Sequence, residues 1–239
     1  MMNTNRTVVS RRSRPAKEPL SHELIVQTAY RLLKDEGMSG MSMRKVAKAL
    51  DTGPSSLYVY VKNLQELSAF VLDHGMGELR YPDGAGVPWQ ERLFDVLTAY
   101  LHLLFEHPGL AELALTTLPM GEHSLRLTET ILSALAEGGI RTTAAAWGVD
   151  LILFYVSSVA FEHVSWKKQG TDQLASIKAS YQSADPARYP QITALGETLF
   201  SGDTSTQDRF RWGLQVILQG ILQTQNEKGA EHHERQNGS

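Results

Sequence analysis

The stretch TGPSSLYVYV, residues 52–61, decides how the N-terminal part of this chain folds. Its second half is aromatic and β-branched, which is the usual composition of a strand. Pro54, however, suits the first turn of a helix, where its missing N–H would have no partner in any case. No segment before residue 150 alternates in polarity over a comparable length, so a strand here would lack a partner. We therefore predict a short helix that begins at Pro54.

Two further helices are predicted before this stretch. Ser21 is placed to cap a first helix that Gly37 ends, and Ser42 is placed to cap a second. A turn over residues 51–53 leads into the helix at Pro54. Three short helices with a tight glycine-containing turn between the second and third are typical of a helix-turn-helix.

The charges of the chain are unevenly distributed. Residues 1–70 hold 11 Lys and Arg against 6 Asp and Glu, whereas residues 71–239 hold 12 against 20. The first part therefore carries +5 and the second −8, which together make the net charge of −3. Such an unevenness can arise by chance, but a basic module on an acidic body is expected when only the first part contacts a polyanion such as DNA.

Composition excludes several classes of protein. The 239 residues contain no cysteine, so neither a disulfide framework nor thiolate chemistry is available. The first twenty residues lack the apolar core of a signal peptide. The longest apolar run, residues 151–161, is shorter than the roughly 20 residues that span a bilayer. We expect a soluble, cytoplasmic protein with no membrane partner.

An enzyme is the main competing class. The sequence contains no nucleophile motif, phosphate-binding loop or H-E-x-x-H motif. His102, Glu106 and His107 could approach one another on a helix, but their spacing matches no standard catalytic site. We interpret them as a solvated helix end before Pro108. The prediction is that the chain is not an enzyme and needs no metal and no cofactor.

The rest of the sequence is predicted to be helical, so the fold class is all-α. Helices are expected over residues 89–106, 109–118, 123–139, 141–168, 190–200 and 207–226, with the polar residues 169–189 as a mobile connection. The helix over 141–168 is apolar nearly all round and is expected to be buried. The predicted parts are a disordered basic arm (1–19), a three-helix helix-turn-helix domain (20–66), a larger helical domain (67–228) and a disordered tail (229–239).

Residues 20–79 resemble the DNA-binding module of the tetracycline-repressor (TetR) family of bacterial transcription regulators. The resemblance rests on four elements: A-x-x-L-L-x-x-x-G, a helix of small residues, S-x-L-Y and K-N-x-x-E-L. In this sequence the first, second and fourth elements are formed by Ala29, Leu32, Leu33, Gly37, Ala47, Leu50, Lys62, Asn63, Glu66 and Leu67. Two weaker similarities, TTLPMG at 116–121 and RFRWGLQVILQGIL at 209–222, point to the subgroup nearest the tetracycline repressors. The resemblance implies a larger C-terminal domain for ligand binding and dimerisation.

A recognition helix presents short polar side chains from its first turn to base edges in the major groove. Here that turn is Pro54, Ser55 and Ser56, with Leu57 pointing inward as an anchor. The hydroxyls of Tyr58 and Tyr60 could reach phosphates or bases, and Val59 a thymine methyl. The resemblance adds Arg44 as a base contact, and Ser42, Thr52 and Lys62 are placed for phosphates. Tyr58 could instead pack in the core, and Arg44 and Lys62 could be solvated surface charges.

One residue departs from the family pattern. Members usually carry a phosphate-contacting Lys two residues beyond the position of Lys62, and here that residue is Leu64. Arg11, Arg12 and Arg14 of the arm could supply the missing charge, in which case deleting residues 1–17 would make affinity less salt-dependent. The alternative is a helix-turn-helix-derived protein that acts through protein contacts without specific DNA binding.

Dimerisation is assigned to the last helix, whose apolar residues recur on one stripe. Paired with the helix over 141–168, this stripe could form a four-helix interface between two copies, although it could equally be an ordinary core helix in a monomer. Two recognition helices one DNA turn apart would then read a palindromic operator. The predicted interface residues are Phe210, Leu214, Ile217 and Ile221.

A pocket for a small-molecule effector is expected among the middle helices, where polar or aromatic residues lie between apolar ones. Asp150 is the most informative, because a buried carboxylate needs a partner. Tetracycline-responsive relatives have a metal-coordinating His where this chain has Ala114, so we expect a largely apolar effector and not magnesium–tetracycline. The predicted ligand-binding residues are Tyr100, Thr117, His123, Thr130, Trp147, Asp150, Phe154, Tyr155 and His163.

Overall fold

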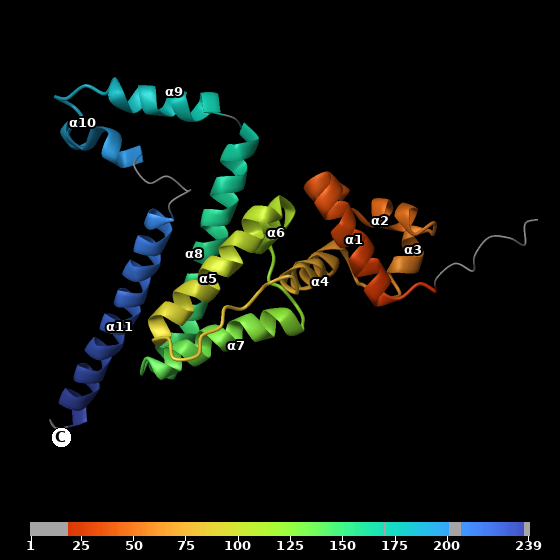
Figure 1. The fold of residues 1–239 in the computed structure, drawn as a ribbon, viewed down its shortest axis with the longest axis horizontal. Helices are drawn as coiled ribbons and strands as arrows, with labels where there is room; N and C mark the ends of the chain where they lie inside the picture. The colour runs from red at the N-terminus through yellow and green to blue at the C-terminus, as the bar shows by residue number, and fades with distance from the viewer. Residues whose placement is uncertain (1–18, 170, 201–206, 237–239) are drawn as a thin grey trace, which may run out of the picture.

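The computed structural model describes residues 19–169, 171–200 and 207–236, so the predicted basic arm lies almost wholly outside the described residues. The described residues form helices and turns without a strand, which confirms the all-α class. A small head of α1 to α3 lies at one end and is joined through α4 to a larger helical body (Figure 1). The elements are α1 (His22–Glu36), η2 (Gly37–Gly40), α2 (Met43–Ala49), α3 (Pro54–Leu57), α4 (Leu64–Met76), α5 (Trp89–Glu106), α6 (Pro108–Thr116), α7 (Glu122–Glu137), α8 (Thr142–Gln169), α9 (Thr171–Gln182), α10 (Pro190–Leu195), η3 (Gly196–Phe200) and α11 (Asp208–Gln236).

The helices of the head begin and end where local sequence signals place them. The Ser21 side chain accepts a hydrogen bond from the Leu24 N–H (3.1 Å) at the start of α1. Gly37 follows the helix with φ of 65°, a conformation that glycine adopts without a steric cost. Ser42 caps α2 by accepting a hydrogen bond from the Lys45 N–H (3.2 Å).

Residues 52–61 form a helical turn and not a strand. Gly53 precedes α3 and Pro54 occupies its first turn, as predicted. The Val61 N–H donates to the Leu57 carbonyl (3.0 Å), so helical hydrogen bonding continues past the end of α3. Leu57 and Val61 are both buried in the head. The apolar residues of 52–61 therefore have two roles. Leu57 and Val61 anchor the segment, and the side chains between them face outward.

Helix α4 belongs to both head and body. Asn63 caps it, because its side-chain oxygen accepts a hydrogen bond from the Glu66 N–H (2.8 Å). Along its length α4 packs against α1 of the head and against α6 and α7 of the body. A movement of the body that displaces α4 would therefore displace the head.

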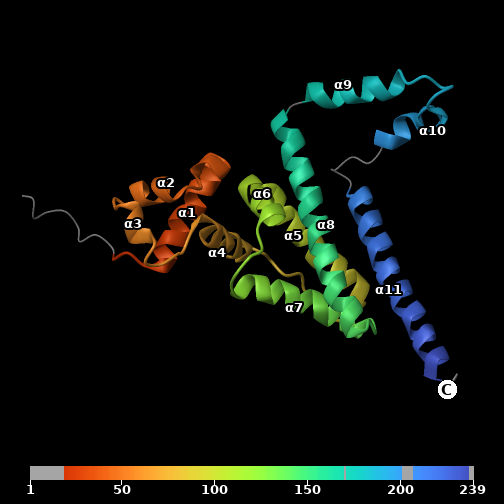
Figure 2. The same cartoon turned by 180° about the vertical axis from the view of Figure 1, so that it is seen from behind.

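Helix α8 lies at the centre of the body and packs against α5, α6, α7 and α11. Seen from behind, α11 runs beside α8 (Figure 2). The two helices are antiparallel, because Gly148 of α8 lies against Ile221 while Tyr155 further along α8 lies against Gly213. Both glycines leave room for these larger side chains, so the helices approach closely.

Three expectations about the body require correction. The polar segment 169–189, predicted to be a mobile connection, contains the twelve-residue helix α9. Helix α11 continues to Gln236, although the tail was predicted to be disordered from residue 229. The Ala, Glu, Arg and Gln residues between 229 and 236 favour a helix. Helix α8 is not buried all round, because Trp147 and Phe154 are mostly exposed.

By length and composition alone, α8 is apolar enough over Thr142–Lys167 to cross a membrane. The core helix of a helical bundle meets the same criterion. Since α8 packs against four other helices of the chain, we interpret it as a helix of the body whose inner side belongs to the core.

A buried carboxylate ties α4 to α7. Asp73 of α4 accepts a hydrogen bond from the Ser124 N–H (2.7 Å) in the first turn of α7, where backbone N–H groups lack helical partners. The Met120 N–H donates to the Ala69 carbonyl of α4 (3.2 Å), just before this turn. The segment between α6 and α7 is thus held against α4 at two points.

Replacing Asp73 by alanine should lower the free energy of unfolding by about 1–3 kcal/mol, because the buried Ser124 N–H loses its partner. Asp73→Asn should lose less, since the amide oxygen can still accept this hydrogen bond. Denaturant titration of both variants gives the values, with Asp95→Ala, an exposed carboxylate of α5, as the control. Equal losses in Asp73→Ala and Asp95→Ala would contradict a capping role.

Candidate nucleic-acid interface and ligand cavities

The outer side of α3 and the turn after it presents a row of exposed residues. Tyr58 is 54% exposed and Val59 is 79% exposed, while Pro54 and Ser55 of the first turn are exposed as well. The competing interpretation, in which Tyr58 packs in the core, does not agree with this exposure. These side chains project from a short helix that Leu57 fixes in the head, which is the arrangement of a surface for recognition.

Helix α2 lines a shallow depression beside this row. Its residues come from α2 and from the turn into α3, where Asp51 has φ of 51°. Lys48 was not among the predicted contacts, although it lies one helical turn from Arg44 on the exposed side of α2 and that spacing could have identified it. The depression is lined by Arg44, Lys48, Asp51, Thr52 and Pro54.

Three of the predicted DNA contacts have partners within the head. The Tyr60 hydroxyl donates to the Leu20 carbonyl (2.7 Å), so it holds the segment before α1 and is not free for the role predicted for it. The Ser42 hydroxyl serves as the α2 cap. Lys62 forms an ion pair with Glu66 (3.6 Å) but is 86% exposed, so its ammonium group remains accessible to a phosphate.

Four predicted ligand-binding residues line one cavity of about 290 Å³ between α4, α6, α7 and α8, named here the α4–α8 cavity. They are Tyr100, Thr117, Asp150 and Phe154. Burial raises the pKa of Tyr100 to about 12, and Ser157, also in the wall, is its hydrogen-bond partner. The phenol therefore stays protonated in a mostly apolar cavity. The wall also includes Leu72, Met76, Ala114, Leu115, Leu127, Thr128 and Leu153.

The other predicted ligand residues do not lie in this cavity. His163 stacks on Phe105, with ring centroids 4.1 Å apart, and burial lowers its pKa. His123 and Trp147 are exposed. The interpretation of Asp150 as a buried carboxylate was wrong, because its side chain is exposed at the cavity rim, on the outward side of α8.

Thr130 lies instead in a second cavity of about 440 Å³, named here the α5–α7 cavity, which the sequence did not indicate. Leu93, Val96, Ile131 and Ala134 form its apolar floor. At the rim, the Arg126 guanidinium lies 4.2 Å above the Tyr81 ring centroid, and Arg92 forms an ion pair with Glu137. Residues from α5, α7 and the loop before α5 meet here only through folding, so no local motif could have shown the cavity.

The predicted dimer stripe packs within the chain. Phe210, Leu214 and Ile221 are buried, and the Phe210 ring is stacked on Tyr155 of α8 (5.7 Å between centroids). The Tyr155 hydroxyl donates to the Arg209 carbonyl (3.3 Å), so this residue belongs to the α8–α11 contact and not to a ligand cavity. The helical period was read correctly, but one sequence cannot tell which partner an apolar stripe packs against.

Other apolar side chains of these two helices face outward. Trp147, Leu151 and Phe154 recur on one face of α8, with 66%, 48% and 60% of their surfaces exposed. Trp212 and Val216 are exposed on the neighbouring α11. The outer apolar face, as we call these five residues, is unusual for a surface exposed to water and is typical of a protein interface.

Comparison with known families accounts for both parts of the chain. Residues 25–67 match the model described as bacterial regulatory proteins, tetR family, and residues 82–225 match the tetracyclin repressor-like C-terminal domain. The HTH-type transcriptional repressor DrrR1 of Streptomyces coeruleorubidus is 28% identical over 220 residues, which cover 88% of this chain and 80% of the relative.

Two solved structures from Streptomyces coelicolor are similar over most of the chain. A candidate transcription regulator is 40% identical, with a TM-score of 0.73, over 86% of this chain and 96% of that one. The TetR-family protein ActR, in complex with actinorhodin, is 29% identical with a TM-score of 0.77, over 87% of this chain and 99% of that one.

Proposed function

Because the chain belongs to the tetR family of bacterial regulatory proteins, we propose that this transcription regulator is a ligand-responsive repressor. Two copies bind a palindromic operator through their heads, and a small, largely apolar effector releases the DNA. The observation that carries the proposal is the exposed row on α3 beside the depression lined by Arg44 and Lys48, attached by α4 to a body with largely apolar cavities. A repressing role is supported by the relative DrrR1.

A second copy of the chain is the partner that the outer apolar face fits. Reading a palindrome requires two heads held at a fixed distance, and a two-fold dimer provides this. The interface we propose is formed by the exposed residues of α8 and α11, because the stripe predicted earlier is already occupied within the chain. A cytoplasmic location belongs to the same proposal, since the DNA of a bacterium lies in that compartment.

Selection from random duplexes tests DNA recognition directly. The full chain should enrich a palindromic sequence and bind it with a Kd of about 10⁻⁸ M or tighter, with an affinity that falls as salt is raised. Absent or salt-insensitive binding would reject the proposal and favour the alternative, a protein that acts only through protein contacts.

The α4–α8 cavity is proposed as the effector site. Leu72 and Met76 of α4 are part of its wall, so a molecule bound there touches the helix that carries the head. The effector class follows from the lining, which is apolar with a few hydroxyl groups and the Asp150 carboxylate at the rim. That ActR binds actinorhodin shows that a related protein accommodates a small molecule. Binding of the effector then lowers the affinity for DNA, and binding of DNA lowers the affinity for the effector by the same factor.

Filling the cavity should weaken the response to the effector. In Ala114→Phe the added ring would occupy part of the α4–α8 cavity, so compounds found in a screen for release of the selected DNA should need at least about tenfold higher concentrations, the equivalent of about 1.4 kcal/mol. Ser133→Phe, at the rim of the α5–α7 cavity, is the control and should respond normally. The reverse pattern, with only Ser133→Phe impaired, would move the effector site to the α5–α7 cavity.

A further inference from the structure

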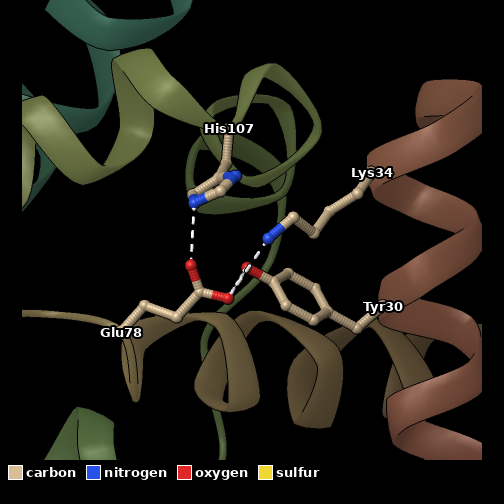
Figure 3. Close-up of polar contacts among 4 residues, drawn as sticks. All are labelled: Tyr30, Lys34, Glu78 and His107. Carbon is tan, nitrogen blue, oxygen red and sulfur yellow. Dashed lines mark hydrogen bonds and ion pairs between the residues drawn. The ribbon is translucent and has the colours of Figure 1, made fainter.

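The carboxylate of Glu78, two residues beyond α4, receives contacts from both head and body (Figure 3). Its Oε1 accepts hydrogen bonds from the Tyr30 hydroxyl (2.8 Å) and the Lys34 ammonium (3.3 Å), both on α1 of the head. Its Oε2 lies 2.9 Å from Nε2 of His107, the single residue between α5 and α6. Each oxygen therefore serves a different part of the molecule. We call these four residues the Glu78 junction.

The junction is organised around an ionised carboxylate. Burial opposes ionisation of Glu78, but the hydrogen bonds from Tyr30 and Lys34 and the charges of His107 and Lys34 outweigh it, so the pKa of Glu78 is lowered. Burial and the contact with Glu78 raise the pKa of Tyr30, which keeps its hydroxyl protonated as a donor. The ring of His74 on α4 packs edge-on against Tyr30 (5.1 Å between centroids).

The head also packs directly against α6, through α1 and η2. Leu33 of α1 lies close to Gly109 of α6, where an added Cβ would lie 2.6 Å from Leu33 Cδ1. Beside it is a cavity of about 330 Å³ whose wall includes Tyr30, Lys34 and His107. Because this cavity leaves part of the space between α1 and α6 unfilled, packing restrains a rotation of α1 against α6 less tightly here than at Leu33. The polar contacts of Glu78 add to the packing of α1 and η2 on α6 in restraining that rotation.

We propose that Glu78 is a positioning residue that fixes the angle between head and body. The inference rests on the proposed function, because in a dimer this angle sets the distance between the two α3 surfaces. A chain with an intact junction tolerates one spacing between operator half-sites, since any other spacing would require both heads to turn. Loss of the junction frees the heads to turn and so relaxes the spacing requirement without altering how each head reads its half-site.

The test uses duplexes in which the selected half-sites are separated by spacers that differ by one base pair. For the wild-type chain, affinity should be highest at one spacing and fall steeply on either side. In Glu78→Gln, which removes the charge, the ratio of affinities between the best and the adjacent spacings should fall at least about threefold. His107→Gln, on the body side of the junction, should change the ratio in the same direction.

A matched control distinguishes positioning from general destabilisation. Glu36→Gln breaks an ion pair of the same kind, Glu36 with Lys45, which lies wholly within the head, so the spacing ratio should not change. A second variant tests the angle between head and body without changing the charged groups of the Glu78 junction. In Gly109→Ala the new methyl group would press on Leu33 and tilt α1, which should move the preferred spacing itself.

Two results would overturn the inference. One is an unchanged spacing ratio in a folded Glu78→Gln variant, and the other is an equal fall in the spacing ratio in Glu36→Gln. Should Glu78→Gln not fold by circular dichroism, His107→Gln and Gly109→Ala decide, and wild-type profiles in both would reject the inference. A wild-type chain that binds no duplex, or that binds without any preference for spacing, fails the proposed function itself, and the inference with it.

Discussion

Replacing Arg44 by alanine is expected to weaken binding to the selected operator about 10- to 100-fold, which corresponds to the roughly 1–3 kcal/mol of a bidentate base contact. Arg44 is exposed in the first turn of α2, at the depression that continues into Pro54 and the row on α3. A guanidinium there can donate two hydrogen bonds to O6 and N7 of guanine. The loss should therefore be concentrated at one base pair, and binding at that position should become less selective.

Lys62 is the comparison for Arg44. It is exposed outside the depression, and its proposed contact is to a phosphate, so Lys62→Ala should weaken all sequences alike and lower the salt slope by about one. Affinities of both variants for the operator and its single-base changes, at two salt concentrations, separate the two roles. Equal losses on every sequence in Arg44→Ala would make Arg44 a phosphate contact and would leave base reading to α3 alone.

Local signals predicted the head well. The two serine caps accept hydrogen bonds from N–H groups three positions later. The glycine after α1 and the proline at the start of α3 act through their own backbone conformations, so one sequence is enough to place all four signals. Both ends of helix α5 were predicted correctly for the same reason, since residues 107–109 end the helix. The period of an amphipathic helix is equally local.

What each helix packs against was less predictable. The apolar stripe of α11 was identified correctly but assigned to a second copy, and α8 itself provides the partner. The α5–α7 cavity and the Glu78 junction bring together residues from separate helices, and nothing near any one of them in sequence indicates the others. Tyr60 illustrates the same limit on a smaller scale, because the carbonyl that accepts its hydroxyl belongs to Leu20, forty residues earlier. Such pairings depend on tertiary geometry, which only the folded chain reveals.

Introducing a charge on the outer apolar face should have the largest effect on function. Leu151 lies between Trp147 and Phe154 on the exposed face of α8. Burying an unpaired carboxylate between two copies costs several kcal/mol, so Leu151→Glu should be a monomer at micromolar concentrations where the wild-type chain is a dimer. Because each head would then bind its half-site alone, operator affinity should fall at least about 100-fold. Analytical ultracentrifugation and DNA titration measure the two effects.

Leu125→Glu provides the matched control, because Leu125 is an exposed leucine of α7 that does not belong to the outer apolar face. Both variants place the same charge on an exposed helix position, so both should keep the helical content of the wild type. If only Leu151→Glu dissociates, the dimer forms through this face, and its loss of DNA affinity follows from the loss of the second head. A Leu151→Glu chain that stays dimeric would place the contact between copies elsewhere. Dissociation with unchanged operator affinity would instead show that one head is sufficient, which would remove the geometric basis for reading a palindrome.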